Sequence, residues 1–196
     1  AGSVKIDGER VNMSEIVERK FAGDKVNLTF IRDGKEQTAE VTLKPFPASS
    51  IYSVQYGKRP RYTIQGGLVF QPLTRNLYSA LRLNNPRVRR LFAKYLTENI
   101  FKERKDIVIL TKVLEDPINA DLSDYTGNAI ESVNGVKIKD LTQLHELLNP
   151  ETIPEFFVIR CYGVNRPLIL PAKNIQKHNT RILQTYGIDK SSYLGK

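Results

Sequence analysis

The stretch QGGLVFQPLT, residues 65–74, sets two glycines before three apolar residues and then places a proline where a strand would continue. A glycine-opened strand can come close to another backbone and offer its N–H groups to an added strand. Proline lacks the N–H group and is confined within sheets to edges and bulges. The stretch therefore predicts a strand at the edge of a sheet, with fewer donors for a partner at Pro72.

The remaining composition is that of an ordinary globular protein and indicates no cofactor. The chain has 196 residues, of which 40% are hydrophobic and 26% charged, and no apolar run approaches the roughly 18 residues of a membrane span. The N-terminus has no signal-peptide core. One cysteine, Cys161, excludes an intrachain disulfide, and no Cys/His spacing indicates zinc. His145 and His178 are expected to be surface or packing residues.

Residues 4–45 and 130–172 follow one plan, which predicts an internal repeat. Each stretch reads as a short strand, an Asx-Gly turn, a helix, a strand that ends in Ile-Arg, a tight turn and a last strand. The turn pairs are Asp7-Gly8 and Asn134-Gly135, and residues of these types tolerate positive φ. Two further strands precede the second copy and none precedes the first. The pattern predicts two similar α+β units, of which the first is truncated at its N-terminal side.

The predicted helix of the second copy has a clear start and one apolar face. Asp140 stands three residues before Gln143, the spacing of a capping box. Leucines at 141, 144, 147 and 148 then follow the helical period. We expect this helix to bury its leucine face.

Four stretches in order carry a resemblance: KFAGDKVNLTFIRDG, GGLVFQPLT, DIVILTKVLEDPINA and ILQTYGIDK. Together they resemble the tandem PDZ region of the HtrA (Deg) serine proteases, most of all the plant-type members. The resemblance implies small antiparallel β-sandwiches or barrels capped by helices. It predicts a partial first PDZ domain, a linker, a second PDZ domain with a helical insertion, and a C-terminal helix and tail. The corresponding ranges are 1–46, 47–61, 62–173 with the insertion at 75–105, and 174–196.

The resembling family consists of ATP-independent serine endopeptidases whose PDZ domains select substrates, regulate activity or hold oligomers together. This sequence contains no GNSGG-type nucleophile loop, and neither histidine has triad-like surroundings, so we expect no catalytic residue. The resemblance predicts a non-catalytic region that serves protein quality control. Its expected partners are protein or peptide tails, its own protease domain, and neighbouring subunits of a homo-oligomer. A periplasmic or plastid location is the leading expectation by resemblance.

The resemblance also maps a peptide-binding site onto the chain. The loop residues are Gly67, Leu68, Val69 and Phe70, and the facing helix contributes Leu141, Leu144 and Leu148. The alternative is that these residues are only sheet and core. Pro72 would remove one ligand hydrogen bond, worth about 1 kcal/mol or about tenfold in affinity. Free tails should therefore bind weakly, whereas a segment supplied in cis or by a neighbouring subunit could still be held.

Most of the net charge of +9 lies in residues 75–105, which hold nine basic and two acidic side chains. Asn85 and Pro86 are typical of a helix start. An apolar stripe follows, with Arg87, Arg89, Arg90 and Lys94 largely on other faces as a candidate interaction surface. Its apolar members are Val88, Leu91, Phe92, Tyr95, Leu96 and Ile100.

Three interpretations of this helix stay open. The stripe covers its own sheet, or it contacts another domain or subunit, or the basic face binds nucleic acid or an anionic membrane. No nucleic-acid motif accompanies the charge, which disfavours the third. For the whole chain, the alternatives are a free-standing PDZ adaptor that binds peptide tails and a basic nucleic-acid-binding module.

Overall fold

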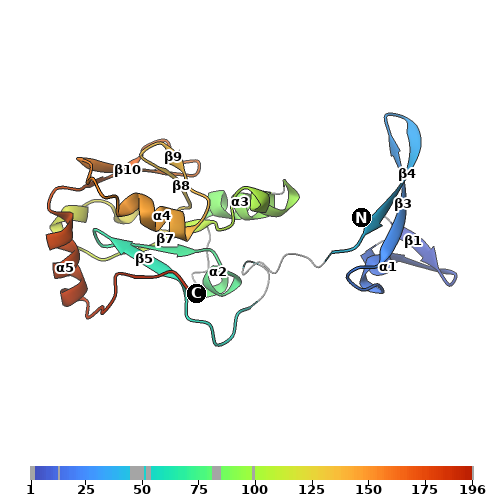
Figure 1. The fold of residues 1–196 in the computed structure, drawn as a ribbon, viewed down its shortest axis with the longest axis horizontal. Coiled ribbons are helices and arrows are strands. Elements are labelled where there is room, and N and C mark those ends of the chain that lie inside the picture. Colours follow the sequence, from blue (N-terminus) through green and yellow to red (C-terminus); the bar gives the residue numbers. More distant parts are fainter. Residues whose placement is uncertain are drawn as a thin grey trace. The chain divides into compact units, whose positions relative to one another are not determined.

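The computed structural model describes residues 3–12, 14–44, 51, 54–80, 85–98 and 100–195 (Figure 1). The chain divides into two compact units, Ala1–Ser49 and Ser50–Lys196. Part of the predicted linker, namely residues 47–50, 52 and 53, lies outside the described residues. The finer domain boundaries stay predictions.

The first unit has the order of elements that its sequence pattern predicts. Its elements are β1 (Ser3–Ile6), β2 (Glu9–Asn12), α1 (Ser14–Glu18), β3 (Lys25–Arg32) and β4 (Lys35–Thr42). Asp7 and Gly8 have φ of 53° and 87°, as the turn between β1 and β2 requires. Val26 pairs with Val41 in the β3–β4 hairpin, so the apolar side chains share one face.

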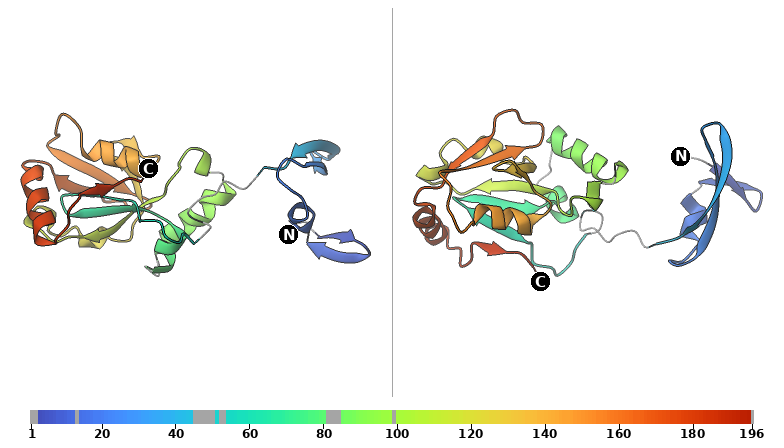
Figure 2. Two further views of the ribbon diagram at one scale, coloured as in Figure 1. Left: turned by 60° about the horizontal axis from the view of Figure 1, so that its bottom comes forward. Right: turned by 45° about the horizontal axis from the view of Figure 1, so that its top comes forward.

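The second unit contains the other fifteen elements of the described chain (Figure 2). Its strands are β5 (Tyr62–Gln65), β6 (Leu68–Pro72), β7 (Val108–Val113), β8 (Ile130–Val133), β9 (Val136–Lys137), β10 (Phe156–Cys161), β11 (Leu168–Pro171) and β12 (Ser192–Tyr193). Its α-helices are α2 (Arg75–Ala80), α3 (Pro86–Thr97), α4 (Leu141–Leu148) and α5 (Ile175–Thr185). Short 3-10 turns are η1 (Ile100–Lys102), η2 (Pro117–Asn119) and η3 (Ser123–Tyr125).

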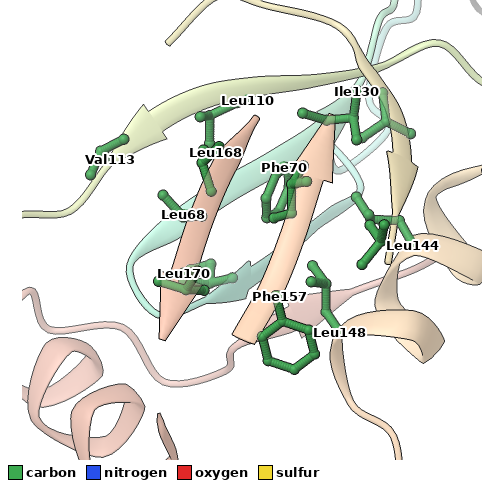
Figure 3. Close-up of a cluster of buried hydrophobic side chains, with 14 of the residues drawn as sticks. Leu68, Phe70, Leu110, Val113, Ile130, Leu144, Leu148, Phe157, Leu168 and Leu170 are labelled. Carbon is green, nitrogen blue, oxygen red and sulfur yellow. The ribbon is translucent and has the colours of Figure 1, made fainter. Parts of the chain in front are cut away.

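Two four-stranded sheets enclose the main core of the second unit. Their strand orders are β12-β5-β6-β7 and β11-β10-β8-β9. Side chains from both sheets and from α4 meet between them, as Figure 3 shows for Phe70, Leu144 and Phe157. Asp140 caps α4 by accepting the N–H of Gln143 at 2.8 Å, as its spacing predicts. The leucine face of α4 is buried because it completes this core.

The insertion between β6 and β7 builds a second, smaller core. Helix α3 begins at Pro86, and the Asn85 side chain accepts the N–H of Arg87 at 3.0 Å. The α3 side chains of Val88, Leu91 and Tyr95 are buried against residues of β7 and neighbouring segments. Residues 81–84 and 99 of the predicted insertion lie outside the described part of the chain, and nothing is described of the Leu96 side chain. The apolar stripe of α3 therefore covers its own domain.

Residues 174–196, predicted as a helix and a tail, contribute α5 and β12 to the second unit. Ile175 and Ile182 of α5 are buried in the main core. Strand β12 pairs with β5 through Ser192 and Thr63. The expected fold class is confirmed: the chain is α+β, with PDZ-like units and a helical insertion in the second.

Candidate functional site

The site is built around the tight turn that joins β5 to β6. Gly66 and Gly67 form this turn with φ of +55° and +79°, a region that favours glycine. A Cβ on Gly67 would lie 2.3 Å from both Asn119 Nδ2 and the Leu114 carbonyl oxygen. A Cβ on Gly66 would lie 2.9 Å from the Leu170 methyl groups. Gly67 is therefore required by backbone angle and by space, and Gly66 is favoured by its backbone angle.

Polar groups of the same chain already bind this turn. The Gly66 N–H donates to Asn179 Oδ1 at 2.7 Å, and Asn119 Nδ2 donates to the Gly66 carbonyl at 2.8 Å. The Gly67 carbonyl accepts the Leu114 N–H at 2.8 Å. A terminal carboxylate of a peptide would compete with Asn179 for the Gly66 N–H. In this conformation the side-chain oxygen of Asn179, on α5, already accepts that N–H.

Strand β6 is not an edge strand, which corrects the expectation drawn from residues 65–74. On one side β6 pairs with β7, and on the other with β5 through Thr63–Phe70, Ile64–Val69 and Gln65–Leu68. The two-residue turn folds β5 back onto β6, so the preceding strand takes the edge that an added peptide would need. The sequence pattern of β6 alone contains no information on this pairing.

Strand β5 is also bound to α4, the helix that would face a peptide. Gln65 Nε2 donates to the Leu148 carbonyl at 2.6 Å, and Thr63 Oγ1 lies 2.8 Å from His145 Nδ1. Burial lowers the pKa of His145, so its imidazole is neutral near pH 7. The neutral ring can accept a hydrogen bond from the Thr63 hydroxyl. Both side chains of β5 are buried. Two side-chain contacts thus hold β5 against α4.

The predicted pocket residues come together, but their side chains fill the core. Leu68, Phe70, Leu141, Leu144 and Leu148 are each 0% exposed, and Val69 is half-buried. Figure 3 shows Leu68, Phe70, Leu144 and Leu148 among the packed side chains of the core. No face of these five side chains is open to a ligand in this conformation. Their role in peptide binding stays a prediction.

Pro72 has the orientation that the sequence suggests. The Leu73 N–H donates to the Ile107 carbonyl on the β7 side, so the nitrogen of Pro72 faces the opposite edge. The pairing of β6 with β5 ends at Phe70, two residues before Pro72, so β5 does not pair with β6 at Pro72. A strand added to β6 would therefore find no donor at Pro72.

Strand β5 fills the position between β6 and α4 that the resemblance gives to a peptide, and we call this position the closed groove. Sequence reasoning missed five residues that hold β5 and its turn there: Thr63, Gln65, Asn119, His145 and Asn179. A signal was present for β5, because the residues YTIQ stand directly before the two glycines and read as a short strand. The asparagines carried no such signal. Asn119 lies 52 positions beyond Gly67 and Asn179 lies 60 positions beyond Asn119, so only the fold brings them to the turn.

Within the described residues, neither histidine is hydrogen-bonded to a serine. His178 Nδ1 lies 2.8 Å from Asp116 Oδ1, but its other neighbour is the guanidinium of Arg181 at 3.0 Å. Burial of Asp116 would raise its pKa, but hydrogen bonds from the Ile118 N–H, Arg181 and His178 outweigh burial and lower the pKa. This cluster attaches α5 to η2. It is an ion-pair arrangement that holds two elements together.

The one cysteine of the chain is buried, and its thiol is protonated near pH 7. Burial raises the pKa of the Cys161 thiol to about 12, so the nucleophilic thiolate is absent near pH 7. No group of His, Cys, Asp and Glu among the described residues could hold a metal ion. No helix among the described residues is both long enough and apolar enough to cross a bilayer.

The candidate interaction surface lies on the solvent side of α3. Arg87, Arg89, Arg90 and Lys94 are all exposed, as predicted from their phase against the buried stripe. Lys94 pairs with Glu98 at 3.1 Å. Within the described residues, no ion pair involves any of the three arginines.

Comparison with known proteins gives a family match over most of the second unit. A family model described as "PDZ domain" matches residues 51–192. The range includes β5, the insertion, α5 and the first residue of β12.

Curated relatives of the chain are named as proteases. The chain is 28% identical over 235 residues to "Serine protease DegP homolog" of Plasmodium falciparum, an alignment that covers 98% of this chain and 25% of the relative. It is 33% identical over 140 residues to "Protease Do-like 4, mitochondrial" of Arabidopsis thaliana, covering 71% and 24%. With "Protease Do-like 2, chloroplastic" of the same plant, identity is 27% over 181 residues, covering 92% and 29%. The chain thus spans about a quarter of the length of these relatives.

Proposed function

Since the chain belongs to the PDZ domain family and is a PDZ region of the HtrA/Deg protease type, we propose that it is the non-catalytic recognition and assembly region of such a protease. It takes part in binding protein partners, in regulation and in oligomer assembly for protein quality control. In this proposal, the peptide bonds of substrates are cleaved by a serine protease domain outside this chain.

The observation that carries the proposal is the pairing of β5 with β6 beside α4. Three residue pairs join β5 to β6, and two side-chain contacts join β5 to α4. The second unit is then a PDZ domain that carries its own ligand strand. It contributes to assembly through its outer surface and does not capture free tails. This favours an assembly role over a free-standing adaptor that binds peptide tails.

A free peptide should bind the second unit only weakly. A strand tethered by a short turn competes at a local concentration in the millimolar range or above, so a peptide of equal intrinsic affinity needs about 1 mM to displace it. The probe is a fluorescein-labelled peptide with the sequence of residues 58–65 and a free C-terminal carboxylate. In an anisotropy titration of the full chain, we expect no saturation below about 1 mM.

A variant with a loosened strand provides the matched comparison. Thr63→Ala with Gln65→Ala removes both contacts to α4, each worth about 1 kcal/mol, and should tighten peptide binding by at least about tenfold. Saturable binding of the peptide to the unmodified chain below about 100 µM, lost when the carboxylate is amidated, would contradict the closed groove.

The isolated chain should not cleave protein substrates. Incubation with unfolded casein is expected to leave the casein band intact, since no described residue provides an activated nucleophile. Cleavage that persists through a second purification step and is blocked by a serine-directed inhibitor would refute the non-catalytic role.

A further inference from the structure

Helix α3 presents a fixed basic surface because its opposite side is anchored. Val88 and Tyr95 are each 1% exposed, and the Tyr95 hydroxyl donates to the Lys105 carbonyl at 2.8 Å. The aliphatic part of Arg87 lies against Gly163, where an added Cβ would come within 3.1 Å of Arg87 Cδ. The helix that carries the arginines is therefore anchored, so little backbone freedom would be lost when a partner binds.

The arginines occupy positions that are unfavourable for the isolated helix. Arg87, Arg89 and Arg90 lie within the first five residues of α3, whose first turn has no acidic residue. The N-terminal end of a helix carries the positive end of its dipole, so cations there are destabilising. Arg87 and Arg90 are also neighbours at spacing i, i+3, where like charges repel. Departures from local rules of this kind are concentrated at functional sites.

The chemistry of these side chains indicates the kind of partner. A guanidinium binds a carboxylate through two parallel hydrogen bonds, and arginine is favoured at such interfaces. The three arginines span about 5 Å along the helix axis. Three cationic groups on this short length are fewer than the six to ten phosphate contacts typical of a DNA-binding protein. The other exposed residue in this half of α3 is Pro86, so no aromatic residue there is exposed for base stacking.

We propose that Arg87 and Arg90, about 60° apart around the helix, form the centre of a docking surface with Arg89 at its edge. The surface would take an acidic protein segment, rich in Asp and Glu, on a partner of this PDZ region. The proposal rests on the assembly role described above and names the surface through which it acts. Carboxylates placed against the start of α3 would offset both the like-charge repulsion and the unfavourable dipole contact.

The test uses the full chain and two probes of similar length. Fluorescein-labelled decaglutamate is titrated by anisotropy at about 0.1 M salt, where exposed charges still interact over about 10 Å. Arg87→Glu with Arg90→Glu should weaken binding by at least about tenfold. Lys173→Glu with Lys177→Glu makes the same change in net charge at exposed positions around the start of α5 and should weaken it less than about twofold.

A ten-residue oligothymidine is the second probe, and thermal melts accompany each titration. An equal loss of decaglutamate affinity in the two double variants would overturn the proposal, since binding would then follow net charge alone. Tighter binding of the oligothymidine, with the same dependence on the arginines, would also overturn it in favour of a nucleic-acid surface. Melting of the arginine variant at or above the unmodified temperature is expected, because Glu is favoured in the first turn. If the docking surface is refuted, the proposal of a closed groove still stands, because the peptide titration tests the groove separately.

Discussion

Replacement of Gly67 by alanine is expected to destabilise the second unit by about 2–5 kcal/mol. The backbone at φ +79° disfavours any side chain by about 1–2 kcal/mol. The new Cβ would also overlap Asn119 Nδ2 and the Leu114 carbonyl oxygen at 2.3 Å. Asn119 would have to move, and its bonds to the Gly66 and Leu114 carbonyls would be lost at about 1–3 kcal/mol. Urea unfolding followed by circular dichroism measures the loss.

Gly127 is the matched control for this substitution. Its φ of +82° is nearly the same, but an added Cβ would meet no atom within 4 Å. Gly127→Ala should therefore show only the backbone effect, about 1–2 kcal/mol. Equal losses at the two positions would mean that the Asn119 contact contributes nothing to the turn.

Replacement of Leu91 by aspartate is expected to unfold the insertion and destabilise the second unit by at least about 3 kcal/mol. Leu91 is 5% exposed, in a cluster with Ile107 and Ile109 of the strand region. A carboxylate at this position would be buried without a partner, which is strongly unfavourable. Thermal melts with light scattering follow both stability and association.

Arg89→Asp provides the control on the same helix, two positions away. Arg89 is exposed, and an acidic residue suits the first turns of a helix, so stability should change by less than about 0.5 kcal/mol. A folded Leu91→Asp monomer formed from a dissociated oligomer would show that the stripe contacts another subunit. An unfolded Arg89→Asp protein would show that the helix faces were assigned wrongly.

Local sequence determined the elements of this protein well. Asp7-Gly8 and Asn134-Gly135 specify turns because their φ values of 53°, 87°, 46° and 83° are those that Asx and Gly tolerate. Asp140 specifies the start of α4, and the period of Val88, Leu91 and Tyr95 specifies which side of α3 is buried. These signals operate over a few residues, so a single sequence displays them completely.

Tertiary structure alone decided that β5 lies beside β6 and closes the groove. The two glycines before β6 are compatible with an open edge and equally with a two-residue hairpin. The hairpin prevails because β5 buries Thr63 and Gln65 and finds partners at His145 and Leu148. Asn119 and Asn179 then bind the turn from η2 and α5. Those contacts join residues 53–113 positions apart, and no local pattern encodes such distances.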